Sequence, residues 1–222
     1  MDLTVAVIAK ECTPGRVKTR LSPPLTPQAA AALAQLSLSH TLDTVRNLPA
    51  RHRLLVMDGT PTERDAAQFI VLPQAPGGLD ERLGAICDAV GGPLLIIGMD
   101  TPQFSADHLE LLLDDWCAAQ ARHEAWMGPA TDGGFWALAL RRPDGALIRG
   151  VPMSTDTTGT HQHDRLRAAG LTTGMLPELR DMDYFSDAVE IAAGMPGTEF
   201  SSAVAKAALL LQNQASIAGA GG

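Results

Sequence analysis

Short apolar segments alternate with longer amphipathic segments along the first two-thirds of the chain, a pattern expected of a mostly parallel sheet covered by helices on both faces. A cap residue and a proline at the first helical position, Thr26-Pro27, open the longest amphipathic segment. The pattern predicts strands at Leu3–Ala9, Arg53–Met57, Phe69–Leu72, Pro93–Met99 and Ala125–Gly128. It predicts helices at Thr26–Val45, Thr62–Gln68, Leu79–Val90 and Ser105–Ala121.

The alternation changes after Asp132, where a tight Asp-Gly-Gly turn leads into the apolar run Phe135–Leu140. Such a turn predicts an antiparallel strand, so we expect a mixed sheet. The later predicted elements are a helix at Asp156–Ala169, a weak strand at Thr172–Leu176, and helices at Ser186–Ala193 and Ser201–Gln214. We therefore predict an α/β fold, a three-layer α/β/α arrangement in one domain over residues 1–215, with an Ala/Gly-rich flexible tail at 216–222.

Composition restricts the classes of partner. The chain has 222 residues, 45% of them hydrophobic, and a formal net charge of -8. This acidic balance repels nucleic acid and anionic membranes, and no apolar run approaches the roughly 20 residues that span a bilayer. The cysteines Cys12, Cys87 and Cys117 form no CxxC pair, which favours a reducing compartment. We expect a cytoplasmic protein that binds neither nucleic acid nor membrane.

A basic loop is the first candidate site. The segment Pro14–Leu21 carries Arg16, Lys18 and Arg20 directly after the first predicted strand and before a long helix. Arginine forks and a lysine point charge suit phosphate oxygens, and Gly15 allows close approach of the backbone. We interpret the loop as a phosphate site, although a solvated basic turn would also fit the residues.

Carboxylates form the second candidate site. Asp100 ends the most apolar predicted strand, where ligands of α/β folds gather, although a turn or capping aspartate would read the same way. Asp181 and Asp183 would share a face of an extended segment. If they approach Asp100, charges about 4 Å apart repel by roughly 4 kcal/mol per pair at an effective dielectric near 20. Oxygen ligands beside a phosphate then favour Mg²⁺ or Mn²⁺.

The stretch from Gly128 to Trp136 joins two apolar segments through consecutive glycines. Its Asp132, Gly133 and Gly134 suit a backbone that lies against a substrate. A plain hairpin turn explains the same residues equally well.

Together these motifs resemble a known family. PGRVKTRL, GMDTP, GPATDGGFWALAL, the Ser154-Thr155 segment and LPELRDMD occur in an order similar to the bacterial glycosyltransferase-like family associated with radical-SAM and selenium-domain proteins. That family belongs to the GT-A, nucleotide-diphospho-sugar transferase superfamily. A more distant resemblance links the chain to phospholactate and molybdenum-cofactor guanylyltransferases. The resemblance covers roughly residues 3 to 187.

The resemblance implies a role for each matching residue. Gly15, Arg16, Lys18 and Arg20 would bind the nucleotide phosphates, and Asp100, Asp181 and Asp183 would bind the metal. Asp100, Lys18 and Asp132 would be the catalytic residues, while Gly133, Gly134, Ser154 and Thr155 would bind the acceptor. Met99 stands where the family usually carries serine, which leaves the acceptor open.

Three functions fit this sequence. The leading hypothesis is glycosyl transfer from a nucleotide sugar to a small-molecule acceptor, with the metal neutralising the leaving diphosphate. The second is nucleotidyl transfer from a nucleoside triphosphate to a phosphorylated acceptor. The third is a nucleotide-binding module without catalysis, which the retained carboxylates disfavour. The sequence leaves a homodimer open.

Overall fold

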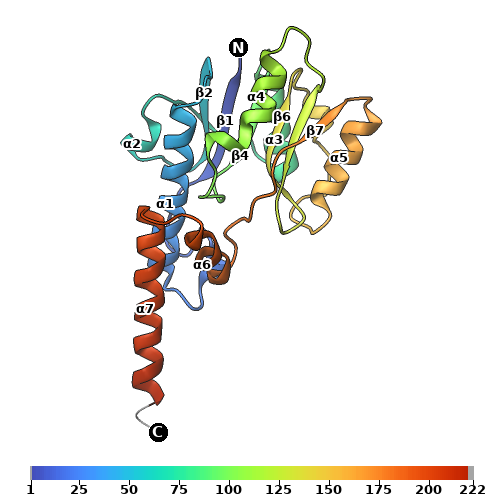
Figure 1. Ribbon diagram of the computed structural model, residues 1–222. Coiled ribbons are helices and arrows are strands. Elements are labelled where there is room, and N and C mark those ends of the chain that lie inside the picture. The colour runs from blue at the N-terminus through green and yellow to red at the C-terminus, as the bar shows by residue number, and fades with distance from the viewer. Residues whose placement is uncertain (1, 220–222) are drawn as a thin grey trace.

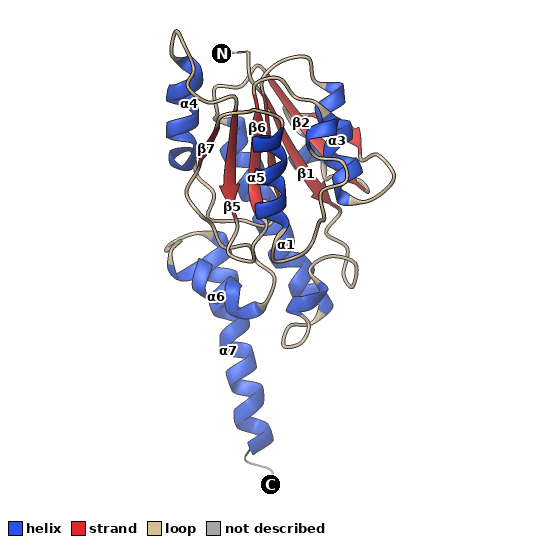
Figure 2. Ribbon diagram, turned by 90° about the vertical axis from the view of Figure 1, so that its right-hand side faces the viewer, coloured by secondary structure: helices blue, strands red, loops and turns tan. Residues whose placement is uncertain are grey.

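The computed structural model describes residues 2–219, in which seven strands form one sheet in the order β3-β2-β1-β4-β6-β5-β7 (Figures 1 and 2). The strands are β1 (Thr4–Lys10), β2 (His52–Asp58), β3 (Ile70–Pro73), β4 (Leu94–Gly98), β5 (Ala125–Pro129), β6 (Phe135–Leu140) and β7 (Thr173–Met175). β6 pairs antiparallel with both β4 and β5, and the other pairs of neighbours are parallel. The predicted mixed, mostly parallel sheet is confirmed.

The helices confirm the remaining pattern with small shifts of their ends. They are α1 (Pro27–Arg46), α2 (Glu63–Ala66), α3 (Leu79–Ala89), α4 (Glu110–Cys117), α5 (Thr158–Ala168), α6 (Phe185–Ala193) and α7 (Glu199–Gly219), with short 3-10 turns at Thr19–Leu21, Ala106–Leu109 and Gly145–Leu147. Thr26 caps α1 as predicted, because its side chain accepts a hydrogen bond from the Ala29 amide.

One predicted helix is shorter than the sequence indicates. The segment expected to be helical over Ser105–Ala121 begins with a 3-10 turn, and α4 ends at Cys117. The buried carboxylate of Asp115 accepts hydrogen bonds from the Arg122 and His123 amides. The chain after α4 therefore folds back onto this carboxylate, and the helix does not continue.

Alternation along the strands divides the core into two layers. Val5 and Val7 of β1 face a cluster that includes residues of α1 and α4, whereas Ala6 faces a second cluster with residues of α3 and α5. Side chains of a strand point to opposite faces in turn, so each strand contributes to both layers. The result is the expected three-layer α/β/α fold.

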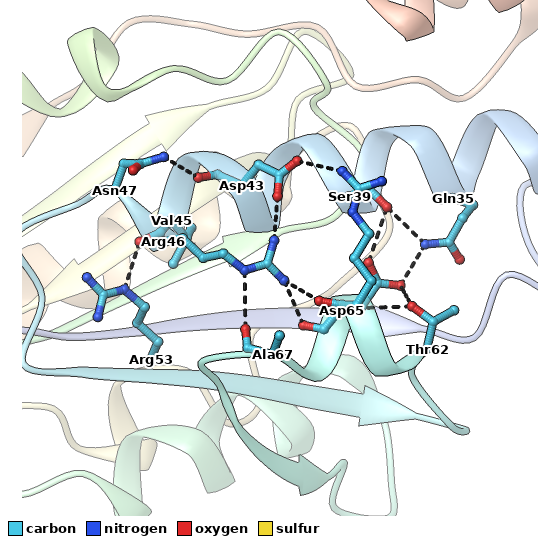
Figure 3. Close-up of polar contacts among 11 residues, drawn as sticks. Gln35, Ser39, Asp43, Val45, Arg46, Asn47, Arg53, Thr62, Asp65 and Ala67 are labelled. Atoms are coloured by element: carbon cyan, nitrogen blue, oxygen red, sulfur yellow. Dashed lines mark hydrogen bonds and ion pairs between the residues drawn. The ribbon is translucent and has the colours of Figure 1, made fainter.

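A network of hydrogen bonds joins the connection between β2 and β3, residues 59–69, to helix α1 (Figure 3). The carboxylate of Asp65, which is buried, accepts hydrogen bonds from Gln35 Nε2 at 2.7 Å, Ser39 Oγ at 3.2 Å and Thr62 Oγ1 at 2.7 Å. Arg46 of α1 donates to the backbone carbonyls of this connection. The network holds α2 against α1.

The last two helices lie at the carboxyl-end side of the parallel strands, and α7 extends away from the sheet (Figure 1). A third core cluster joins them to the first half of α1 and includes Leu33, Met182 and Phe200. Helix α7 runs through 216–219, the first part of the expected flexible tail, and 220–222 lie outside the described residues.

No helix within residues 2–219 combines the length and the apolar character that a membrane span requires.

Candidate functional site

A cleft with a volume of about 860 Å³ lies along the carboxyl ends of β1 and β4 and extends to the start of α5. This is within the range of about 300–1,000 Å³ that small-molecule sites occupy. Asp100, which follows β4, lies in its wall as the sequence predicted for a ligand site at a strand end.

Backbone pairing brings the two predicted acidic segments to this cleft. Ala130 and Leu179 form a parallel bridge, so Asp132 and Asp181, each two residues further along, leave it in the same direction. The Met182 amide then donates to the Asp100 carbonyl oxygen at 2.9 Å. Residues 82 positions apart in sequence, Asp100 and Met182, thereby lie beside one another.

Three of these carboxylates form a compact cluster. One oxygen from each of Asp132, Asp181 and Asp183 lies within 4.8 Å of the others. Burial, followed by the charges of Asp132, Asp100 and Asp183, raises the pKa of Asp181 to about 6. The cluster carries unfavourable negative charge that a cation would relieve.

The basic loop reaches the cluster through Lys18 and Arg20. Lys18 Nζ lies 2.9 Å from Asp100 Oδ2 and 2.9 Å from Asp183 Oδ1, and Arg20 contacts Asp183 Oδ2 at 2.8 Å. Burial opposes the charge of Lys18, but Asp100 and Asp183 outweigh it and raise its pKa. Burial likewise opposes ionisation of Asp183, yet Lys18 and Arg20 lower its pKa. The predicted meeting of basic loop and acidic segments is present.

The other two predicted phosphate residues lie farther out. Gly15, with φ of 76°, and Arg16 are both exposed, and neither is among the described residues that line the cleft. Lys18 is not among them either, and it meets the cleft through Asp100 and Asp183, which do line it. Asp100 contacts Lys18, and the compact carboxylate cluster joins Asp132 to the predicted Asp181 and Asp183. Its role as a metal ligand stays a prediction.

The Asp-Gly-Gly turn is held rigidly at the cleft. Asp132 Oδ1 accepts from the Gly134 amide at 2.8 Å, and the Gly133 carbonyl accepts from the Gly159 amide at 2.8 Å. A Cβ on Gly133 would lie 1.9 Å from the Asp156 carbonyl oxygen, and its φ is +87°. Only glycine fits this position, so the turn presents Asp132 in one fixed place.

The predicted acceptor residues lie near this turn. Ser154 and Thr155 are exposed and line the cleft together with Gly134. Ser154 has φ of 59°, a conformation that non-glycine residues rarely adopt. Gly133 lies within the turn and is not among the described residues that line the cleft.

Sequence reasoning assigned no role to the opposite end of the cleft, which Lys10, Asp58, Gln74 and Arg82 line. Gln74 Nε2 donates to the Ala9 carbonyl at 2.7 Å, and Gln74 Oε1 accepts from Arg82 at 2.9 Å. Both side chains are therefore oriented before any ligand binds. The sequence feature that could have indicated Gln74 is its position, directly after the end of the strand β3.

Charge in the cleft is mixed and predominantly acidic. Seven carboxylates and four cationic side chains line it; the carboxylates are Asp58, Asp100, Asp132, Asp156, Asp181, Asp183 and Asp187, and the cations are Lys10, Arg20, Arg82 and Arg180. A phosphate group alone would meet repulsion at the carboxylate end. A bound cation would offset that repulsion.

A sequence family matches about half of the chain. Its model, described as an uncharacterized protein conserved in bacteria (DUF2064), covers residues 41–155. No curated protein matches the sequence.

Solved structures share the fold over nearly the whole chain. A protein of Desulfovibrio desulfuricans G20, provisionally assigned as a nucleotide-diphospho-sugar transferase, superposes with a TM-score of 0.83 at 19% identity and covers 96% of this chain and 98% of its own. CMP:2-keto-3-deoxy-manno-octonic acid synthetase complexed with CTP gives a TM-score of 0.56 at 13% identity, covering 88% and 98%. A cytidylyltransferase from Leptospira borgpetersenii serovar Hardjo-bovis gives 0.53 at 13%, covering 98% and 96%. The fold is that of the nucleotide-diphospho-sugar transferases.

Proposed function

The chain belongs to the DUF2064 family of bacterial proteins, and we propose that it is a transferase that uses a nucleotide-activated donor and a divalent cation. The observation that carries the proposal is the meeting of Lys18 with Asp100 and Asp183, at 2.9 Å each, beside the cluster of Asp132, Asp181 and Asp183. Cationic side chains and a carboxylate cluster in one cleft are what a diphosphate with a bound dication requires.

The carboxylates fit Mg²⁺ or Mn²⁺. Three carboxylate oxygens within 4.8 Å of one another offer an all-oxygen set, which hard dications prefer to thiolate or imidazole ligands. Burial, and after it the charges of the neighbouring carboxylates, raises the pKa of Asp181, and a bound cation would favour its ionised form. We assign the ion to Asp132, Asp181 and Asp183, with Asp100 beside it. When bound, it would neutralise charge that develops on a leaving phosphate.

The protein's own groups would position the donor. Lys18 and Arg20 would bind phosphate oxygens, Arg20 through a forked guanidinium that is 65% exposed. The rigid turn around Asp132 would lie at the transferred group, and Ser154 and Thr155 would contact the acceptor. The nucleoside would then occupy the opposite end, where Gln74 and Arg82 are already oriented. Positioning and electrostatic stabilisation would supply most of the catalysis.

Glycosyl transfer from a nucleotide sugar to a small acceptor is the leading reaction. The likeness of the whole fold to the Desulfovibrio protein, with a TM-score of 0.83, supports it. Nucleotidyl transfer to a phosphorylated acceptor is the second candidate. Likeness to a synthetase solved with CTP, at a TM-score of 0.56, favours that candidate.

A thermal-shift panel separates these reactions. Nucleoside triphosphates and nucleotide sugars of each base are added with Mg²⁺, Mn²⁺ or EDTA, because a ligand that binds the native state raises the melting temperature. Glycosyl transfer predicts the largest metal-dependent rise with a nucleotide sugar, and nucleotidyl transfer predicts it with a triphosphate.

Two variants test whether the response comes from this cleft. Asp181→Asn should abolish the metal-dependent rise, whereas Asp164→Asn, at an exposed carboxylate of α5, should leave it unchanged. A full panel without any metal-dependent response in the wild-type protein would reject the proposed function.

A further inference from the structure

Lys18 occupies Asp183, a carboxylate that the proposed cation needs, and also contacts Asp100 beside it. We propose that Lys18 is an internal counter-ion that blocks the cation site until donor phosphates draw it away, so that the donor and the dication bind cooperatively. This inference rests on the proposed function and adds the order in which the cleft fills.

Both carboxylate oxygens of Asp183 are already bound by cationic side chains. Its Oδ1 accepts from Lys18 Nζ at 2.9 Å and its Oδ2 accepts from Arg20 at 2.8 Å, so both oxygens are engaged by cations. Asp183 is also one of the three clustered carboxylates. A dication on Asp183 would lie against the ammonium group of Lys18, and the two positive charges would repel. Full occupancy of the cation site therefore requires Lys18 to move.

Burial distinguishes Lys18 from its neighbour. The Lys18 side chain is 12% exposed and touches two carboxylates, whereas Arg20 is 65% exposed and touches one. A buried ammonium needs partners for its charge, so Lys18 leaves Asp100 and Asp183 only for another anion. Donor phosphate oxygens at the same cleft supply that anion.

The backbone at Lys18 is consistent with a side chain held in place by these ion pairs. Its φ of 44° and ψ of 45° lie in the left-handed region, which non-glycine residues adopt at a cost. Such strain persists where the surrounding contacts fix the conformation, and it concentrates at ligand-binding and switch segments. The two ion pairs hold its side chain, and its carbonyl oxygen accepts a hydrogen bond from the Leu21 amide at 3.0 Å.

Reciprocity follows from this arrangement. If phosphates draw Lys18 away and so release Asp183 for the cation, the cation must strengthen phosphate binding by the same factor. The resting cleft is then protected from capture of dications without a donor, although its carboxylates lie close together.

Binding of Mn²⁺ alone to the full chain, followed by electron paramagnetic resonance, tests the blocking role. Lys18→Met should tighten Mn²⁺ binding by about tenfold or more, within the range typical of coupled sites. Arg20→Met is the matched control, because it removes a cation at 2.8 Å from the same Asp183. It should change the affinity much less. Lys206→Met, at an exposed position on α7, controls for net charge.

A second arm uses the wild-type protein and inorganic pyrophosphate, so that the test survives a Lys18 variant that fails to fold. The affinity for pyrophosphate is measured at several concentrations of free Mn²⁺, corrected for the complex that the two form in solution. The proposal predicts that Mn²⁺ strengthens pyrophosphate binding, and that pyrophosphate strengthens Mn²⁺ binding by the same factor.

The outcomes separate this inference from the function. Tight Mn²⁺ binding by the wild-type protein, unchanged in Lys18→Met, or equal gains in Lys18→Met and Arg20→Met, would overturn the blocking role and leave the cation site standing. Absence of Mn²⁺ binding in every variant, with pyrophosphate present, would overturn both.

Discussion

Asp181 lies among other carboxylates, and burial together with their charges raises its pKa from 3.8 to about 6. Because the folded state holds this proton more tightly than the unfolded state, the group favours folding below about pH 4, and that contribution is lost as the pH rises through 6. Asp181→Asn should therefore stabilise the metal-free protein at pH 7.5 by about 1–3 kcal/mol. Melting temperatures of both proteins from pH 4 to 8, in EDTA, measure the difference.

The pH profile gives the control for this prediction. Near pH 4 the difference should become small, because the wild-type carboxyl is then protonated in the folded state and close to half protonated in the unfolded state. Saturating Mg²⁺ at pH 7.5 should reverse the order, since only the wild-type protein keeps the full set of ligands. A constant difference at every pH would show that the effect comes from packing and not from charge.

Gly133 supports the turn that fixes Asp132. Gly133→Ala places a Cβ 1.9 Å from the Asp156 carbonyl oxygen at φ of +87°, so both overlap and backbone strain oppose it. Gly170→Ala is the matched control, with φ of +78° and no heavy atom within 4 Å of the added Cβ. We expect about 1–2 kcal/mol of destabilisation at Gly170 and clearly more at Gly133. Urea denaturation measures both, and equal losses would contradict the account.

Individual site residues were only partly predictable from sequence. Strand-end position identified Asp100, and the alternation of an extended segment identified Asp181 and Asp183. Asp132 lies beside Asp181 and Asp183 because Ala130 and Leu179 form a bridge between two segments that are far apart in the sequence. Local patterns do not specify such a pairing, so the composition of the cluster required the structure.

At the scale of elements, the Asp65 network makes a prediction about stability alone. Asp65→Ala leaves Gln35, Ser39 and Thr62 without their common acceptor (Figure 3). Because these buried donors are left unpaired, the free energy of unfolding should fall by about 2–4 kcal/mol, measured by chemical denaturation. Asp164→Ala, at an exposed position, should cost less than about 0.5 kcal/mol. Metal and nucleotide binding by Asp65→Ala below its melting temperature should match wild type; a specific loss would link this network to the site.

The elements themselves followed the hydrophobic pattern closely. Phe135–Leu140 has the predicted bounds, because the apolar run and the glycine turn before it both mark the strand. The helix predicted to reach Ala121 instead ends at Cys117. The Asp115 carboxylate accepts hydrogen bonds from the backbone amides of Arg122 and His123, which follow the helix. That interaction is tertiary, and an amphipathic pattern carries no sign of it.

At the scale of the molecule, α1 connects the sheet core with the C-terminal helices. Leu38 packs in the sheet core and Leu33 in the cluster with Phe200, so the two clusters share one helix. Phe200→Ala should lower the free energy of unfolding by about 3–5 kcal/mol, and the variant should still unfold in one transition. Leu210→Ala on the same helix α7, at a position 54% exposed, should have little effect. Calorimetry distinguishes one transition from two, and a separate early transition would show that α6 and α7 unfold independently.

The central claim is that one cleft binds a dication and a diphosphate between the basic loop and the carboxylate cluster. Anomalous diffraction from crystals soaked with MnCl₂ and a nucleoside diphosphate locates both directly. The account predicts a manganese peak bound by Asp132, Asp181 and Asp183, with the diphosphate between that peak and Lys18 and Arg20. A manganese peak or a diphosphate elsewhere on the molecule, with this cleft empty, would contradict it.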